Sequence, residues 1–168
     1  GRHYEIELAD GTLATGYPRG KKSPFAVGDE VELTPDGQIT GHAVRRSLLY
    51  RSDLYRQKLI AANATQLLLV VATDPSFSDM LLSRALVAAE HEGLTTTIVL
   101  NKSDLTAALP SARKLLAPFV ALGCRVVELS ARSDPSPLLP LLVGESSVLV
   151  GQSGMGKSTL INALLPDA

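Results

Sequence analysis

The sequence predicts an α/β chain in two parts, a small all-β domain followed by a parallel sheet flanked by helices. Two observations carry this prediction. The first 48 residues alternate in short apolar and polar steps, with glycine-containing turns and no helical periodicity. From about residue 60, longer apolar runs alternate with helical stretches, which is typical of parallel strands buried on both faces.

The N-terminal part is predicted to contain four strands. Asp10-Gly11 and Pro35-Asp36-Gly37 favour tight turns between neighbouring strands. The strands are expected at residues 4–8, 12–17, 31–33 and 39–44. So many strands in so short a segment favour a small barrel of the OB or SH3-like type. We expect an OB-fold barrel over residues 1–50 and a basic linker over 51–62.

The second domain is expected over residues 63–168. Its predicted strands are Leu67–Ala72, Thr95–Leu100, Arg125–Leu129 and Ser147–Val150. Helical spacing from Met80 to Ala88 predicts a first helix that Gly93 ends. A second helix is expected from Ser111 to Leu122, kinked or interrupted at Pro118, which lacks an amide donor.

A proline-rich loop at residues 134–137 precedes a short apolar helix predicted over residues 138–143. The last predicted helix runs from Thr159 to Leu165.

Composition indicates a folded core and excludes several classes of protein. The 168 residues are 45% hydrophobic and 20% charged, a balance that argues against disorder. The longest apolar run, Leu67–Ala72, is far shorter than the ~20 residues that span a bilayer. One cysteine and three histidines supply neither a disulfide nor a metal cluster. We expect a reduced, cytoplasmic protein without a leader or membrane association.

The net charge of −1 hides two local clusters of cations. Arginine and lysine are dense near Gly20 and again over residues 45–58, where Asp53 is the one acidic residue. The candidates for contact with nucleic-acid phosphate are Arg19, Lys21, Lys22, Arg45, Arg46 and Arg51. A solvated loop and linker remain the alternative interpretation.

The strongest motif matches all eight positions of a P-loop. It follows the strand Ser147–Val150 and precedes a predicted helix. Its glycines let successive backbone N–H groups face phosphate oxygens, and the helix N-terminus adds a positive dipole. The predicted phosphate contacts are Gly151, Gln152, Ser153, Gly154, Met155, Gly156, Lys157, Ser158 and Thr159. Lys157 would reach the β- and γ-phosphates, and the Ser158 hydroxyl would bind magnesium.

A second motif, Asn101-Lys102-Ser103-Asp104, follows the strand Thr95–Leu100. Ligands of open α/β sheets bind at this carboxyl end. The Asp104 carboxylate is an acceptor that matches the adjacent N1–H and N2 donors of guanine, which adenine lacks. Asn101 would hold the loop and the base edge, while the stem of Lys102 covers the ring.

Ser130 and Ala131, after the next predicted strand, are small enough to let a backbone N–H approach guanine O6. The pair carries little meaning without the other two motifs.

The order of these motifs is reversed relative to Ras-like GTPases, because the base motifs precede the P-loop. A barrel followed by such a circularly permuted GTPase domain resembles the bacterial ribosome small-subunit-dependent GTPase A family, RsgA. The resemblance covers essentially the whole chain. Besides the three motifs it includes Ala26-Val27-Gly28-Asp29-Glu30-Val31 and Ile60-Ala61-Ala62-Asn63.

The resemblance implies a monomeric GTP-binding and GTP-hydrolysing factor of late small-subunit maturation, whose hydrolysis that subunit stimulates. Its partners would be the small subunit and its rRNA, with GTP or GDP and magnesium bound. The chain stops ten residues after Ser158. We therefore expect the GTPase domain to be incomplete, with the effector threonine, the Asp-x-x-Gly motif and the zinc-binding domain beyond Ala168. No catalytic residue is assigned, and we expect the 168-residue chain to hydrolyse no GTP by itself, because these switch regions are absent from it.

Two alternatives from other classes stay open. One is a P-loop ATPase or small-molecule kinase in which residues 101–104 match by accident. The other is a nonenzymatic RNA-binding barrel protein whose nucleotide site is structural.

Overall fold

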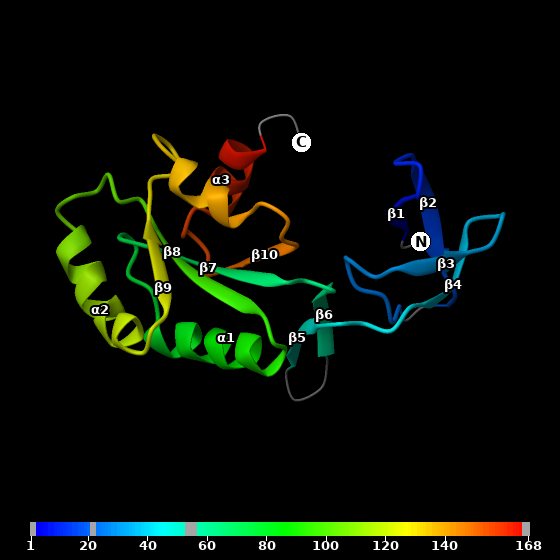
Figure 1. Ribbon diagram of the computed structural model, residues 1–168, viewed down its shortest axis with the longest axis horizontal. Coiled ribbons are helices and arrows are strands. Elements are labelled where there is room, and N and C mark those ends of the chain that lie inside the picture. The colour runs from blue at the N-terminus through cyan, green and yellow to red at the C-terminus, as the bar shows by residue number, and fades with distance from the viewer. Residues whose placement is uncertain (1–2, 21–22, 53–56, 166–168) are drawn as a thin grey trace. The chain divides into compact units, whose positions relative to one another are not determined.

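The computed structural model describes residues 3–20, 23–52 and 57–165, and the chain divides into two compact units, Gly1–Asn63 and Ala64–Ala168. Figure 1 shows the small strands of the first unit and the helix-flanked sheet of the second. The two-part α/β organisation predicted from the sequence is therefore observed.

The first unit contains a four-stranded sheet in the order β1-β2-β4-β3. Its strands are β1 (Tyr4–Glu7), β2 (Leu13–Pro18), β3 (Val31–Leu33) and β4 (Gln38–His42). β1 and β2 are antiparallel, β3 and β4 are antiparallel, and β2 runs parallel to β4. Gly11 and Gly37 adopt positive φ in the two predicted turns. The four strands are confirmed, whereas their closure into an OB barrel stays a prediction.

Within the segment predicted as a basic linker, residues 51–52 and 57–62 belong to strands. β5 (Leu48–Ser52) and β6 (Gln57–Ala62) pair antiparallel, with a register shift after Leu49. This hairpin buries few large side chains, since Leu49, Ala61 and Ala62 are its buried residues. With so few buried positions among exposed cations, the sequence here shows little alternation of apolar and polar residues. This explains why hydrophobic periodicity did not predict the two strands.

An ion pair holds the loop that precedes β3. The Arg45 guanidinium donates to both carboxylate oxygens of Asp29 at 2.7 Å and also to the Pro24 carbonyl. The Asp29 side chain is 1% exposed and also accepts the Ala26 amide. Burial raises the pKa of Asp29, but the hydrogen bonds from Arg45 and Ala26 outweigh it and leave the pKa below its usual value.

The second unit is built on a parallel sheet in the order β10-β7-β8-β9. Its strands are β7 (Gln66–Ala72), β8 (Thr95–Asn101), β9 (Arg125–Glu128) and β10 (Ser147–Val150). Every residue of β7 is buried, as expected for a central parallel strand covered on both faces. Among the described residues, β10 and β9 lie at the two edges of this sheet.

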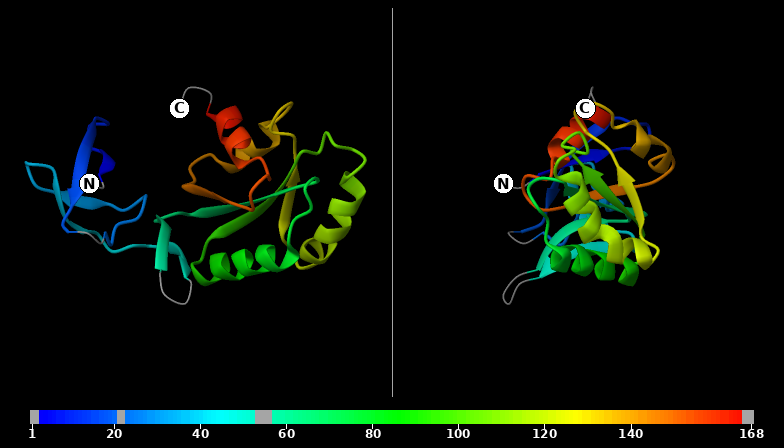
Figure 2. Two further views of the ribbon diagram at one scale, coloured as in Figure 1. Left: turned by 180° about the vertical axis from the view of Figure 1, so that it is seen from behind. Right: turned by 90° about the vertical axis from the view of Figure 1, so that its left-hand side faces the viewer.

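Helices cover both faces of the sheet. α1 (Asp79–His91) and α2 (Leu109–Ala121) lie on one side, with η1 (Ser136–Leu141) and α3 (Lys157–Leu164) on the other (Figures 1 and 2). Right-handed crossovers explain this arrangement. The chain steps from β7 to β8 to β9 in one direction, then returns past both inner strands to β10 and so changes face.

Every predicted helix begins earlier in the structure, α1 by a single residue. α2 begins at Leu109 without a side-chain cap, so Ser111 lies inside it, and the helix continues through Pro118. The predicted apolar helix is a 3₁₀ helix that begins at Ser136, and α3 begins at Lys157. Prolines near the N-termini of α2 and η1 favour these earlier starts, because their fixed φ suits a first turn.

Over the described ranges of the chain, no helix is both long and apolar enough to cross a membrane.

We predict that Arg45→Met lowers the unfolding free energy of the first unit by about 2–4 kcal/mol, because it leaves the Asp29 carboxylate buried without its cation. Since the folded-state pKa of Asp29 is lowered, the pair contributes fully above the ordinary aspartate pKa of about 3.9. The difference between wild type and variant should therefore shrink as the pH falls below about 4. Urea titrations followed through NMR signals of residues 4–42 measure it.

The control is Arg19→Met, which removes an exposed arginine whose Nε donates to Gln38 at 3.2 Å. Equal losses for both variants, or no dependence on pH, would contradict a stabilising role for the ion pair.

Candidate nucleotide site

Three loops converge at the carboxyl end of the parallel sheet. They follow β8, β9 and β10, and they surround a cavity of about 520 Å³. The predicted site residues that line it are Asn101, Lys102, Asp104, Ser130, Ala131, Ser153, Gly154, Gly156, Lys157, Ser158 and Thr159. Gly151, Gln152 and Met155 belong to the same loop but are not among the lining residues. The structure thus brings both base motifs together with the P-loop.

The P-loop, residues 151–158, connects β10 to α3. Gly154 and Gly156 adopt φ of +82° and +86°, in the left-handed region that suits glycine. Gly156 is also the N-cap residue of α3, which begins at Lys157. The first amides of α3 therefore lie beside the cavity, where a helix N-terminus favours an anion.

Two glycines are required by close approach of other groups. A Cβ at Gly151 would collide with the carbonyl oxygen of Val70 in β7, and one at Gly156 would collide with the Asn101 amide nitrogen. The beginning of the P-loop thus packs closely on β7, and its end packs closely on Asn101 of the base motif.

Lys157 bonds to its own loop. Its Nζ donates to the carbonyl oxygens of Gly151 and Gln152, both at 2.7 Å. These contacts keep the ammonium group at the cavity wall. A phosphate would compete with both carbonyls for this cation.

Asn101 connects all three loops. The side chain, 2% exposed, donates from Nδ2 to the Met155 carbonyl at 3.0 Å. Its Oδ1 accepts the amides of Lys102 at 2.8 Å and Ala131 at 2.9 Å. The expectation that Asn101 holds the loop therefore agrees with the geometry, and the same side chain also positions the P-loop.

Lys102 and Asp104 are oriented by the backbone around them. Lys102 has a positive φ of 61°, and its Nζ donates to the Asp74 carbonyl at 2.7 Å. The Thr73 hydroxyl donates to the Lys102 carbonyl, and the Ser103 amide donates to Leu129. These bonds fix the turn from which Asp104 reaches the cavity, with an exposed carboxylate that can accept two donors.

The Ser130–Ala131 segment is buried at the cavity wall. The Ala131 amide already donates to Asn101 Oδ1, so this N–H is engaged within the protein. Donation from this segment to guanine O6 stays a prediction.

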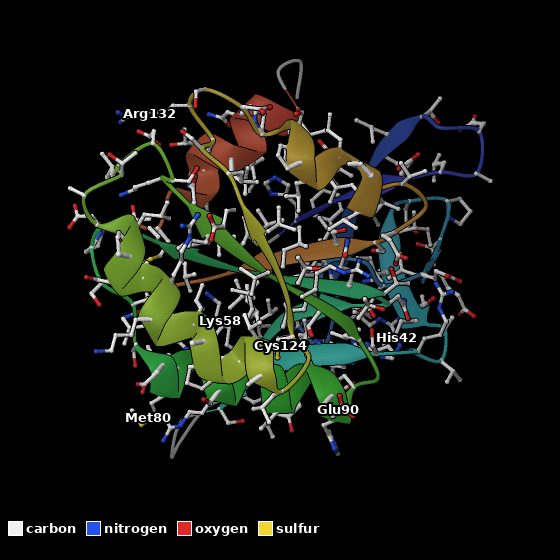
Figure 3. All side chains as sticks on the ribbon, turned by 60° about the vertical axis from the view of Figure 1, so that its left-hand side comes forward. His42, Lys58, Met80, Glu90, Cys124 and Arg132 are labelled. Atoms are coloured by element: carbon white, nitrogen blue, oxygen red, sulfur yellow. The ribbon has the colours of Figure 1, made fainter. Side chains whose placement is uncertain are left out.

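Sequence reasoning missed two residues that line the cavity, Leu105 and Arg132. Each directly follows a predicted base motif, and this adjacency was the available signal. Arg132 lies at the periphery in Figure 3, by the loop after β9. Its guanidinium adds a positive charge to the site.

The donor set fits one part of a magnesium site. Ser158 is exposed at the start of α3 and lines the cavity beside Lys157, so its hydroxyl suits a hard cation that prefers oxygen. Within the described ranges, no three histidine, cysteine, aspartate or glutamate side chains gather as a metal cluster.

The candidate RNA-contact cations differ in how they are held. Arg19, Arg46 and Arg51 are exposed, whereas Arg45 is bound to Asp29. Lys21 and Lys22 lie outside the described residues. Arg45 therefore has a structural role that the sequence did not indicate.

Comparisons with known proteins agree with this architecture. The family model described as RsgA GTPase matches residues 42–168. Proteins called small ribosomal subunit biogenesis GTPase RsgA, from Burkholderia pseudomallei and Paraburkholderia xenovorans, are 53% identical over the whole chain. The chain covers 56% of the length of each of these relatives.

A solved structure is also similar. The crystal structure of YjeQ from Thermotoga maritima superposes with a TM-score of 0.74 at 32% identity, covering 99% of this chain and 62% of that one. With the permuted order of the site motifs, these matches lead to one conclusion: the chain belongs to the RsgA GTPase family.

Proposed function

We propose that this protein binds and hydrolyses GTP in late maturation of the small ribosomal subunit, with hydrolysis stimulated by that subunit. The observation that carries the proposal is the cavity in which a guanine-matching motif and a P-loop meet through the Asn101 side chain. The names of the relatives, which are small ribosomal subunit biogenesis GTPases, support it.

The proposed nucleotide contacts follow from the geometry. Asp104 accepts the two guanine donors, and the stem of Lys102 covers the base. The backbone amides of the P-loop and the start of α3 bind phosphate oxygens, and Lys157 exchanges its loop carbonyls for phosphate. Ser158 supplies one oxygen to magnesium, which neutralises charge on the phosphates when bound.

The proposed RNA surface includes the β5–β6 hairpin. Arg51 and Lys58 are directly opposite in the register of these two strands, and both are exposed. Like charges at opposed positions repel, so an anionic partner between them would relieve the repulsion. The position of Lys58 on β6 can be found by its label in Figure 3. We propose rRNA phosphate as this partner, and a cytoplasmic, monomeric protein as the form that binds it.

Nucleotide competition distinguishes the proposal from its alternatives. Displacement of a fluorescent GDP analogue by GDP and GTP, with no effect of ATP, is expected for the proposed function. Preference for ATP would favour an ATPase or kinase. Absence of any nucleotide binding would favour the nonenzymatic RNA-binding protein. GTP turnover measured with and without small subunits tests the proposed stimulation.

We predict that Asp104→Asn weakens GDP binding by about 1.5–3 kcal/mol, because guanine loses a charged acceptor. Binding of xanthine nucleotides should rise in exchange, since an amide can donate to the xanthine carbonyl. Calorimetric titration measures both effects. Asp36→Asn, in the exposed β3–β4 turn, is the control. Unchanged GDP affinity in the Asp104 variant would refute the base assignment.

We predict that Lys157→Ala lowers affinity for GDP and GTP by roughly tenfold to a hundredfold, the effect of removing a charge-assisted hydrogen bond. The melting temperature of the nucleotide-free protein should stay nearly unchanged, because the bonds removed are to loop carbonyls beside the cavity. Lys114→Ala, exposed on α2, is the control. A large fall in the melting temperature without nucleotide would instead indicate a structural lysine.

We predict that neutralising Arg19, Arg46 and Arg51 weakens small-subunit binding, and that the salt slope of binding falls by about one for each phosphate left without its cation. Arg45 is left intact because it holds Asp29. The matched control neutralises Arg84, Lys114 and Arg125, which are exposed in the second unit. If both triple variants bound like wild type at every salt concentration, the RNA surface would lie elsewhere.

A further inference from the structure

The loop between β7 and α1, residues 73–78, makes hydrogen bonds to both the Asn101–Asp104 motif and the P-loop. Thr73 donates to the base motif, through its amide to Asn101 and through its hydroxyl to Lys102. In the opposite direction, the Lys102 ammonium group donates a hydrogen bond to the Asp74 carbonyl oxygen. At its other end, the Ser78 amide donates to the Gln152 side-chain oxygen of the P-loop at 2.7 Å.

The contact at Ser78 completes the cap of α1. Ser78 is the N-cap residue, and its hydroxyl accepts the Leu81 amide at 3.3 Å. In a complete capping box, a glutamate or glutamine three residues after the N-cap accepts the N-cap amide in return. Leu81 occupies that position and has no polar side chain. Gln152, 74 residues away in sequence, supplies the missing acceptor.

Gln152 also bonds to Lys157 through its main chain. Its carbonyl oxygen accepts the Lys157 ammonium, while its side chain accepts the Ser78 amide. The side chain is therefore directed at α1, in keeping with its absence from the cavity lining. A phosphate would take Lys157 from the Gln152 carbonyl, but it would bind the P-loop amides in exchange and so hold the loop that carries the Gln152 side chain.

We propose that Gln152 is a positioning residue, which couples nucleotide binding to the order of the first turn of α1 by completing its cap from within the P-loop. The inference rests on the proposed nucleotide binding. Because such coupling is reciprocal, bound nucleotide orders the helix start, and the capped helix start holds the P-loop for nucleotide.

Hydrogen exchange in the wild-type protein tests the coupling directly. Saturating GDP should slow exchange of the Ser78 and Leu81 amides by about threefold to tenfold, the range of one neutral hydrogen bond. Amides in the last turn of α1, near His91, serve as the internal reference. GDP binding without any change at Ser78 and Leu81 would overturn the inference and leave the proposed function intact.

Variants at position 152 give the second measurement. Gln152→Met keeps an unbranched chain without the acceptor, so GDP should dissociate about threefold to tenfold faster and the GDP-dependent protection should disappear. Gln152→Glu keeps an acceptor oxygen and should preserve slow Ser78 exchange without nucleotide. Because a negative charge on the P-loop would by itself weaken binding of an anionic nucleotide, GDP affinity is not compared for this variant, and the rescue is measured only by Ser78 exchange without nucleotide.

Ser83→Ala is the matched control on α1, because the Ser83 hydroxyl donates to the backbone carbonyl of Asp79, within the same helix. It should leave GDP dissociation unchanged. Wild-type dissociation and protection in Gln152→Met would overturn the inference. If that variant does not fold, the wild-type exchange measurement decides. A wild-type protein that binds no GDP would refute the proposed function and this inference with it.

Discussion

The candidate nucleotide site depends on one buried amide side chain, that of Asn101. Asn101 has a donor group and an acceptor oxygen, and it uses them on backbone groups from three loops that are distant in sequence. A buried polar side chain is stable only when its hydrogen bonds are made, so each loop is held where Asn101 requires it. The absence of a side chain at Gly156 is part of the same constraint, because a Cβ there would displace the Asn101 amide.

The permuted order of the motifs has little effect on this geometry. In a parallel sheet, every strand delivers its following loop to the same edge, whichever strand comes first in the chain. β10 lies next to β7, and β7 lies next to β8, so the P-loop and the base motif meet although they are about fifty residues apart in sequence. Spatial order of the strands, rather than their sequence order, builds the cavity.

The first unit depends on a different kind of contact. It has few large buried side chains, and a nearly buried ion pair between Asp29 and Arg45 fixes the loop before β3. Gly28 in that loop packs directly on the Ala62 carbonyl of β6, where a Cβ would collide. Polar contacts and close backbone approach thus hold together a unit whose apolar core is small.

The sequence by itself determined the strands of the parallel sheet and the turns at Asp10-Gly11 and residues 35–37. It also predicted that the motifs at residues 101–104, 130–131 and 151–158 lie together in one site. These features are local, since apolar runs, turn residues and loop glycines act through near neighbours in the chain. Tertiary structure decided the β5–β6 hairpin, the structural role of Arg45 and the cap that Gln152 gives to α1. Each of these needs a partner from another element, and a single sequence does not encode which distant residue supplies it.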